Sequence, residues 1–113
     1  MKTHKVYIIE LSKAVWKEKK KFREANKHYN GNLECLYVGI TKHDPIVRFK
    51  KHITGYRNKN GIKISSRIVE KYGLYLRPTL YEFLNPISYK DAKRIEEELS
   101  DSLRKRGYAV WWN

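Results

Sequence analysis

The sequence has little cysteine, no long apolar run and none of the common cofactor or zinc motifs. Its one cysteine, Cys35, can form neither an internal disulfide nor a zinc cluster, so we expect a small buried side chain in a reducing compartment. The N-terminal apolar stretch is too short for a signal peptide or a membrane span, which favours a cytoplasmic protein. A glycine-rich phosphate loop and a pair of histidines at helical spacing are missing, which argues against a small-molecule cofactor.

Acidic residues are also scarce. The chain has 25 Lys and Arg against 12 Asp and Glu, which gives a formal net charge of +13. A small folded domain tolerates this self-repulsion most readily when its partner is a polyanion, so we expect a nucleic-acid partner; an inert basic surface is the alternative. The few carboxylates are mostly scattered singly, which argues against a two-metal nuclease site.

The length of 113 residues and the hydrophobic content of 41% favour one compact, ordered domain over residues 1–113. We expect a small α+β fold in which a central antiparallel or mixed sheet is flanked by helices. The segment 74–84 has the composition of a strand, but Pro78 cannot donate to a ladder, which favours an edge position or a break. The expected strands are 5–11, 35–40 and 108–112, and the expected helices are 12–27, Pro45 to near Gly55, 65–73 and 89–106, with a basic loop at 56–63. The helix at 65–73 has serine caps at Ser65 and Ser66 and a terminal Gly73, and the last helix has a capping box of Ser88 and Asp91 and a C-terminal stop at Gly107.

Arg48 and His52 lie four residues apart in the helix that is expected to begin at Pro45, after an Asp44 cap. Residues at this spacing share one helix face, so a cation and a titratable imidazole would stand side by side. Such a pair suits phosphate chemistry. A solvated basic face is the alternative.

Glu96 is the acidic residue that needs an explanation. It falls at the edge of the apolar stripe of the longest expected helix, whereas Glu97 and Glu98 point toward solvent. A carboxylate at the edge of a core can bind a divalent metal or pair with a nearby arginine, and the helix alone leaves both open. The stripe is formed by Ala92, Ile95, Leu99 and Leu103.

Three residues in the first two expected strands complete the candidate set. Gly39 inside a strand marks either a close approach of another group to the backbone or a bulge. Tyr7 and Tyr37 have the positions of core rings whose hydroxyl groups need partners.

Taken in order, these positions resemble the GIY-YIG nuclease family, over nearly the whole chain from Val6 onward. That family has two short strand motifs, then an essential arginine, a histidine or tyrosine four residues later, and a metal-binding glutamate four residues after an alanine. The matching positions are "VYI" at 6–8, "YVG" at 37–39, Arg48, His52 and Glu96 after Ala92.

The resemblance implies a DNA endonuclease that uses a single Mg²⁺ or Mn²⁺ held by Glu96. Arg48 would stabilise charge on the phosphate, and Tyr7, Tyr37 and His52 would surround the attacking water, one of them as general base. Flanking DNA, including branched or damaged DNA, would contact basic segments at 13–27, 50–63 and 104–106. Gly39, Lys42, Lys51 and Asn113 are the expected binding residues.

The sequence departs from the family pattern in three ways. A basic helical insertion at about 12–32 separates the two motifs, and Lys5 precedes the first motif where a glycine is usual. Some members have a lysine at the position of Ile40. The late asparagine of many members has one counterpart here, the terminal Asn113, and terminal residues are often frayed.

Two other functions are compatible with the same residues. One is a catalytically inactive nucleic-acid-binding module of the same fold, and the other is a small basic protein of a ribonucleoprotein. The binding module would need Arg48 and the lysines but would be indifferent to Glu96→Ala. The ribonucleoprotein component would tolerate His52→Ala and show no metal dependence.

Overall fold

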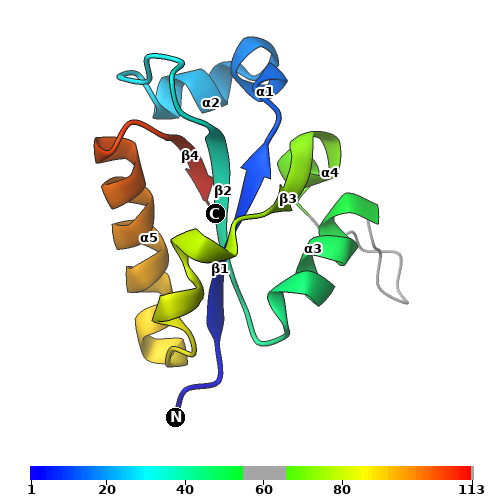
Figure 1. The fold of residues 1–113 in the computed structure, drawn as a ribbon, viewed down its shortest axis with the longest axis vertical. Helices are drawn as coiled ribbons and strands as arrows, with labels where there is room; N and C mark the ends of the chain where they lie inside the picture. The colour runs from blue at the N-terminus through cyan, green and yellow to red at the C-terminus, as the bar shows by residue number, and fades with distance from the viewer. Residues whose placement is uncertain (55–65, 113) are drawn as a thin grey trace.

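The computed structural model describes residues 1–54 and 66–112, which form one four-stranded sheet with helices on both faces (Figure 1). The strand order is β3-β1-β2-β4; β1 is antiparallel to β2 and β3, and β2 is parallel to β4. The expected α+β fold with a small mixed sheet is therefore confirmed at this level. The elements are β1 (Lys5–Leu11), α1 (Ala14–Glu18), α2 (Lys20–Ala25), β2 (Cys35–Thr41), α3 (Pro45–Thr54), α4 (Arg67–Tyr72), β3 (Gly73–Leu76), the 3-10 turns η1 (Pro78–Leu80) and η2 (Glu82–Leu84), α5 (Tyr89–Lys105) and β4 (Ala109–Trp112).

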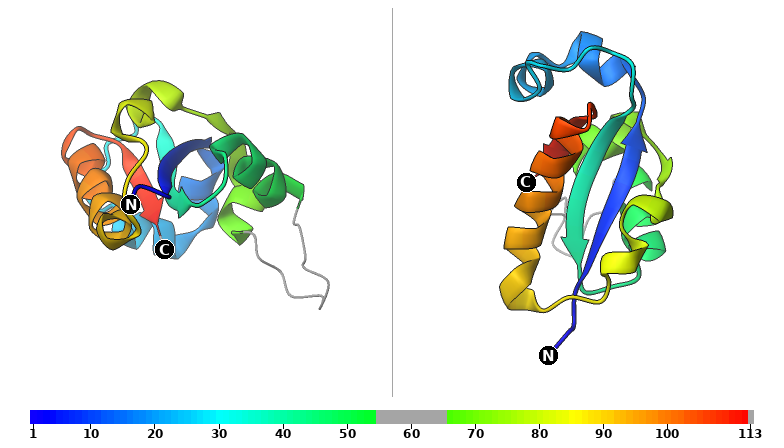
Figure 2. Two further views of the ribbon diagram at one scale, coloured as in Figure 1. Left: turned by 90° about the horizontal axis from the view of Figure 1, so that it is seen from below. Right: turned by 60° about the vertical axis from the view of Figure 1, so that its left-hand side comes forward.

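The two central strands lie where the sequence predicts them. Both are apolar on both faces because α5 covers one face of the sheet while α3 and α4 cover the other (Figure 2). The β1–β2 ladder runs without interruption from Lys5↔Thr41 to Leu11↔Cys35. Cys35 is fully buried, as expected.

The expected single helix over 12–27 is wrong, because the structure divides this segment into α1 and α2. Lys19 between them has an extended backbone, with φ −115° and ψ 102°. The rings of Trp16 and Phe22 pack edge-on at 6.5 Å, although residues six apart would lie about 120° apart around one continuous helix. The guanidinium of Arg23 donates to the carbonyls of Trp16 and Lys17, which satisfies the end of α1.

The insertion is anchored in the core rather than loosely attached. Val15 and Phe22 are fully buried, and Trp16 also packs against Tyr29 with ring centroids 4.9 Å apart. These contacts fix the basic face of α1 and α2 relative to the sheet.

The segment 74–84 is a strand only at its start. The edge strand β3 ends at Leu76, Arg77 N–H makes one further bond to Ile8 O, and Pro78 then opens the 3-10 turn η1. The edge position and the break that Pro78 favours are therefore both confirmed, since proline has no N–H to continue the ladder.

Two asparagine side chains take the place of missing strands at the sheet edges. Beyond β3, Asn85 accepts from Val6 N–H at 2.8 Å and donates to Val6 O at 2.7 Å. On the other edge, Asn26 at the end of α2 accepts from Val110 N–H at 2.7 Å and donates to Val110 O at 3.0 Å. Edge backbone groups that would otherwise be unpaired are thus satisfied.

The helix ends agree with the sequence in α5 but only partly in α4. Ser88 accepts from Asp91 N–H and donates to the Asp91 carboxylate, and Gly107 follows α5 with φ +109°, as the capping pattern predicts. Ser66 occupies the N-cap position of α4 without a side-chain cap bond, and Gly73 has φ −64°, so it does not form a left-handed cap. The expected basic loop at 56–63, the helix stop at Gly55 and the cap at Ser65 lie outside the described residues.

Candidate active site

Gly39 provides the floor on which the ring of Tyr7 lies. The two residues are direct partners in the β1–β2 ladder, and a Cβ atom at Gly39 would lie 2.5 Å from both Cζ and Oη of Tyr7. The ladder continues through this pair, so the alternative of a bulge is wrong. The expected close approach is confirmed, and the approaching group is the phenol of Tyr7.

His52, on helix α3, forms a hydrogen bond with the hydroxyl group of Tyr7. The imidazole is fully buried, its Nε2 lies 2.8 Å from Tyr7 Oη, and its Nδ1 accepts from Ser66 N–H at 2.9 Å. Burial, with a smaller contribution from the charge of Arg48, lowers the pKa of His52 to about 4, so the ring is neutral at pH 7. Because a neutral imidazole has one proton and Nδ1 is an acceptor, we assign the proton to Nε2, which donates to Tyr7.

Tyr37 completes a compact group with these two rings, which we call the tyrosine–histidine cluster (Tyr7, Tyr37 and His52). The Tyr37 ring lies 6.3 Å from Tyr7 and 5.6 Å from His52, measured between centroids. Burial raises the pKa of both tyrosines, and the charge of Arg48 partly opposes that rise in each. The cation is therefore close enough to stabilise a phenolate at either position.

Helix α3 places Arg48 and His52 as the sequence predicts. Pro45 occupies its first position, and Asp44 Oδ1 accepts from Ile46 N–H at 2.9 Å, so the expected cap is confirmed. The alternative of a solvated basic face is wrong for His52, which is buried, while Arg48 is half-buried.

The orientation of α3 is unusual for a surface helix. Phe49 packs against the core, but three other apolar side chains are 41% to 55% exposed while the histidine is fully buried. This departs from the usual arrangement of an amphipathic helix, in which the whole apolar face packs on the core. The exposed apolar residues are Ile46, Val47 and Ile53.

Glu96 lies at the centre of the buried face of α5, not at its edge as the sequence suggested. Its exposed fraction is 2%, whereas Ile95 and Leu99, which were expected at the centre, are only half-buried. The helix is rotated so that its inward positions follow an i, i+4, i+8, i+11 pattern. These inward residues are Ala92, Glu96, Ser100 and Leu103.

Glu96 forms an ion pair with a lysine rather than with the expected arginine. Lys93 Nζ lies 3.5 Å from Glu96 Oε1, and the lysine side chain is 71% exposed. Burial raises the pKa of Glu96, and Lys93 opposes this only in part. Within residues 1–54 and 66–112, Glu96 Oε2 has no hydrogen-bond partner. A buried carboxylate oxygen without a partner has the capacity to receive a cation or a donor.

Metal ligands are few around Glu96. Among the described residues, no group of three His, Cys, Asp or Glu side chains could hold an ion. A magnesium ion commonly keeps several waters and takes one or two protein carboxylates together with substrate phosphate oxygens, so one carboxylate is compatible with that mode. The charge of Glu96 also raises the pKa of Tyr37, so the carboxylate and the cluster act on each other.

The remaining expected residues are less closely involved. Lys42 is exposed just after β2, Lys51 is half-buried on α3, and Asn113 lies outside the described residues. Ser66 was expected only to cap α4, yet its backbone fixes the His52 tautomer and its side chain lowers the pKa of Tyr37. The sequence carries no pattern that would have placed Ser66 there, because the contact spans 14 residues.

No family model matches this chain, and neither the curated proteins nor the solved structures include a match to it. Along the described part of the chain, no helix has the length and apolar content needed to cross a membrane.

Proposed function

We propose that this chain is a divalent-metal-dependent endonuclease of the GIY-YIG type that hydrolyses phosphodiester bonds in DNA. The observation that carries the proposal is that helix α3 buries a neutral histidine on Tyr7, beside Arg48, while three of its apolar residues are exposed. Burying a polar group in place of available apolar ones lowers stability, so such an arrangement points to a functional site.

Glu96 is the residue proposed to hold the metal ion. Its Oε2, which lacks a partner among the residues that the structure describes, and its burial fit a single hard cation. When bound there, Mg²⁺ or Mn²⁺ would act as a Lewis acid toward the scissile phosphate.

Tyr7 is the proposed general base. His52 Nε2–H donates to Tyr7 Oη and Arg48 lies nearby, so both groups stabilise a negative charge on this oxygen. After Tyr7 has lost its own proton to solvent, the phenolate would take a proton from the water whose oxygen attacks phosphorus. The bond from phosphorus to the leaving oxygen breaks, and that oxygen takes a proton from solvent. In this tautomer His52 is a donor and not the base, because its Nδ1 is occupied by Ser66 N–H.

Arg48 has a second proposed role on the substrate. Its half-buried guanidinium stands next to both tyrosines, where it can donate to the phosphoryl oxygens as charge gathers on them. The formal charge of +13 supplies the attraction for the DNA backbone, so binding should weaken steeply with salt.

A second candidate is a nucleic-acid-binding module of the same fold without catalysis. It is favoured by the ion pair between Lys93 and Glu96, which gives the carboxylate a partner without any metal. Such a module would need the basic residues and would be indifferent to Glu96.

The test is nicking of supercoiled plasmid and cleavage of branched DNA by the purified chain, in Mg²⁺ and in chelator. Arg48→Lys serves as a variant that keeps the charge but loses the bidentate fork, and we expect it to lower the rate by at least about tenfold. Metal-dependent nicking supports the nuclease. Intact plasmid and intact branched DNA, with tight binding in a gel shift, would leave only the binding module.

A further inference from the structure

A basic groove lies beside the tyrosine–histidine cluster, between the insertion, α4 and the end of β4. Its cavity measures about 650 Å³, within the range of small-ligand sites in proteins. We define the basic groove by those of its lining residues that have a charged group, a hydroxyl group or an indole ring. These are Lys19, Lys21, Ser66, Arg67, Lys71 and Trp111.

The groove combines cations with an aromatic wall. Of its four cations, Lys71 pairs with Glu18 at 3.3 Å. Across the described ranges, Lys19, Lys21 and Arg67 form no ion pair with a carboxylate. Three uncompensated positive charges around one hollow favour an anionic occupant. The half-buried indole of Trp111 adds a flat apolar surface.

Two contacts connect the groove to the proposed active site. Ser66 lines the groove and also donates its backbone N–H to His52. Trp111 is the direct partner of Tyr37 in the parallel β2–β4 pairing, so the two side chains lie on the same face of the sheet. A polynucleotide that occupies the groove would therefore continue toward the cluster.

We propose that the basic groove binds an unpaired nucleotide of a DNA strand, with its phosphates on the lysines and arginine and its base stacked on Trp111. A paired base is already stacked within its duplex, whereas an unpaired base is free to lie on an indole ring. This inference rests on the proposed function and extends it. It makes branched DNA or DNA with a single-stranded flap the preferred substrate.

The first experiment measures binding of a fluorescent 15-nucleotide oligo(dT) and of a blunt 15-base-pair duplex by anisotropy, in chelator so that nothing is cleaved. Trp111→Leu removes the ring on which the base would stack, so this variant should bind oligo(dT) at least about 5-fold more weakly than the wild type. Trp111→Phe retains a ring and should recover most of the affinity. Trp112→Leu is the matched control, because alternation places Trp112 on the other face of β4.

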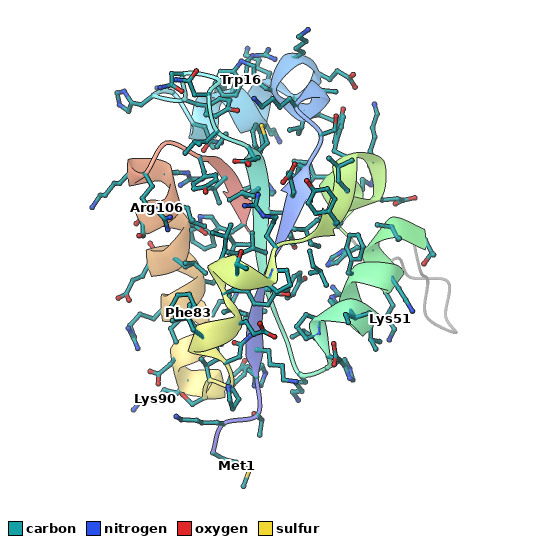
Figure 3. All side chains as sticks on the ribbon, in the orientation of Figure 1. Met1, Trp16, Lys51, Phe83, Lys90 and Arg106 are labelled. Atoms are coloured by element: carbon teal, nitrogen blue, oxygen red, sulfur yellow. The ribbon has the colours of Figure 1, made fainter. Side chains whose placement is uncertain are left out.

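The second experiment tests the cations. Lys19→Gln with Lys21→Gln should reduce the slope of log affinity for oligo(dT) against log salt by about 0.7 for each lysine. Lys2→Gln with Lys90→Gln removes the same charge at the opposite end of the molecule from the insertion. This control variant should bind oligo(dT) with the affinity of the wild type. Figure 3 shows Met1 and Lys90 at one end and Trp16 of the insertion at the other.

The outcomes separate this inference from the nuclease itself. If Trp111→Leu has an unchanged melting temperature and binds oligo(dT) as tightly as the wild type, the proposed nucleotide binding in the groove is wrong, even if the plasmid is nicked. An equal loss in the two lysine pairs would also overturn it. If oligo(dT) binds tightly in a manner that depends on Trp111 but no DNA is nicked, the proposed nucleotide binding in the groove is supported and the proposed nuclease activity is contradicted. A parallel oligo(U) titration tells whether the strand must be DNA.

Discussion

Helices α3 and α5 cover opposite faces of the sheet, and each buries one ionisable side chain. The two side chains differ in how completely they are satisfied. Both nitrogens of His52 have partners, Tyr7 and Ser66. Glu96 has one exposed lysine near one oxygen and, in the part of the chain that the structure describes, no partner for the other. A satisfied buried group maintains local geometry, whereas an unsatisfied one is kept where a ligand completes it.

The largest expected effect concerns the hydroxyl group that His52 positions. Tyr7→Phe keeps the ring over Gly39 but removes the proposed general base, so cleavage should fall by about 10²- to 10⁴-fold. Single-turnover cleavage of plasmid in Mg²⁺ measures the loss. Tyr81→Phe is the control, since Tyr81 is another buried tyrosine with its pKa raised to about 12 by burial, outside the cluster. If Tyr7→Phe cleaves DNA as fast as the wild type, the tyrosine–histidine cluster has a structural role and not a catalytic one.

The next effect is on stability. His52→Phe fills the same space but leaves Ser66 N–H and Tyr7 Oη without their buried partner, so the free energy of unfolding should drop by about 2–4 kcal/mol. Urea denaturation measures the drop. His43→Phe, at an exposed histidine, should change the stability very little. A His52 variant as stable as wild type would contradict the view that both of its bonds matter.

The pH dependence of stability should have opposite signs at the two sites. The folded pKa of His52 is about 4 against 6.5 in the unfolded chain, so the unfolded state binds more protons between these values and stability rises with pH there, by up to about 3 kcal/mol. The pKa of Glu96 is raised above 4.5, so the folded state binds more protons and stability falls as pH rises past that value.

Thermal unfolding from pH 4 to pH 8 separates the two contributions. His52→Phe should abolish the rising limb and Glu96→Gln the falling limb. If Glu96→Gln left the limb above pH 4.5 unchanged, the carboxylate would be better satisfied than its contacts indicate.

The smallest expected effect is at the lysine that partners Glu96. Lys93→Gln removes the charge that holds the pKa of Glu96 down, so this pKa should rise further. Because Lys93 is largely exposed, the free energy of unfolding should change by only about 0.5 kcal/mol. A loss of several kcal/mol would show that the pair is a structural unit and would favour the binding module.

The sequence was sufficient for the elements whose patterns are local. Apolar, β-branched and aromatic runs placed β1 and β2, the Asp44-Pro45 pair placed the start of α3, and Ser88 with Asp91 placed the start of α5. At Gly39 the sequence left a close approach or a bulge open, and the structure shows the close approach.

The features that sequence missed all depend on tertiary contacts. The break between α1 and α2 follows from packing of Trp16 on Phe22, and the side chain of Asn85 pairs with Val6 beyond the end of β3. The rotation of α5 that centres Glu96 could not be read from an apolar stripe, because the stripe assumes that carboxylates avoid the core. The burial of His52 by α3 violates a similar assumption for a histidine, and both violations lie at the candidate site.

The most direct test of the account compares two neighbouring glutamates of α5 in one plasmid-nicking assay with Mg²⁺. Glu96 is buried and Glu97 is exposed, so the pair differs in environment rather than in chemistry. The account predicts that Glu96→Gln loses nicking by at least about 100-fold while its melting temperature stays at or above that of wild type, and that Glu97→Gln nicks normally. Full nicking by Glu96→Gln, or an equal loss in both variants, would contradict it.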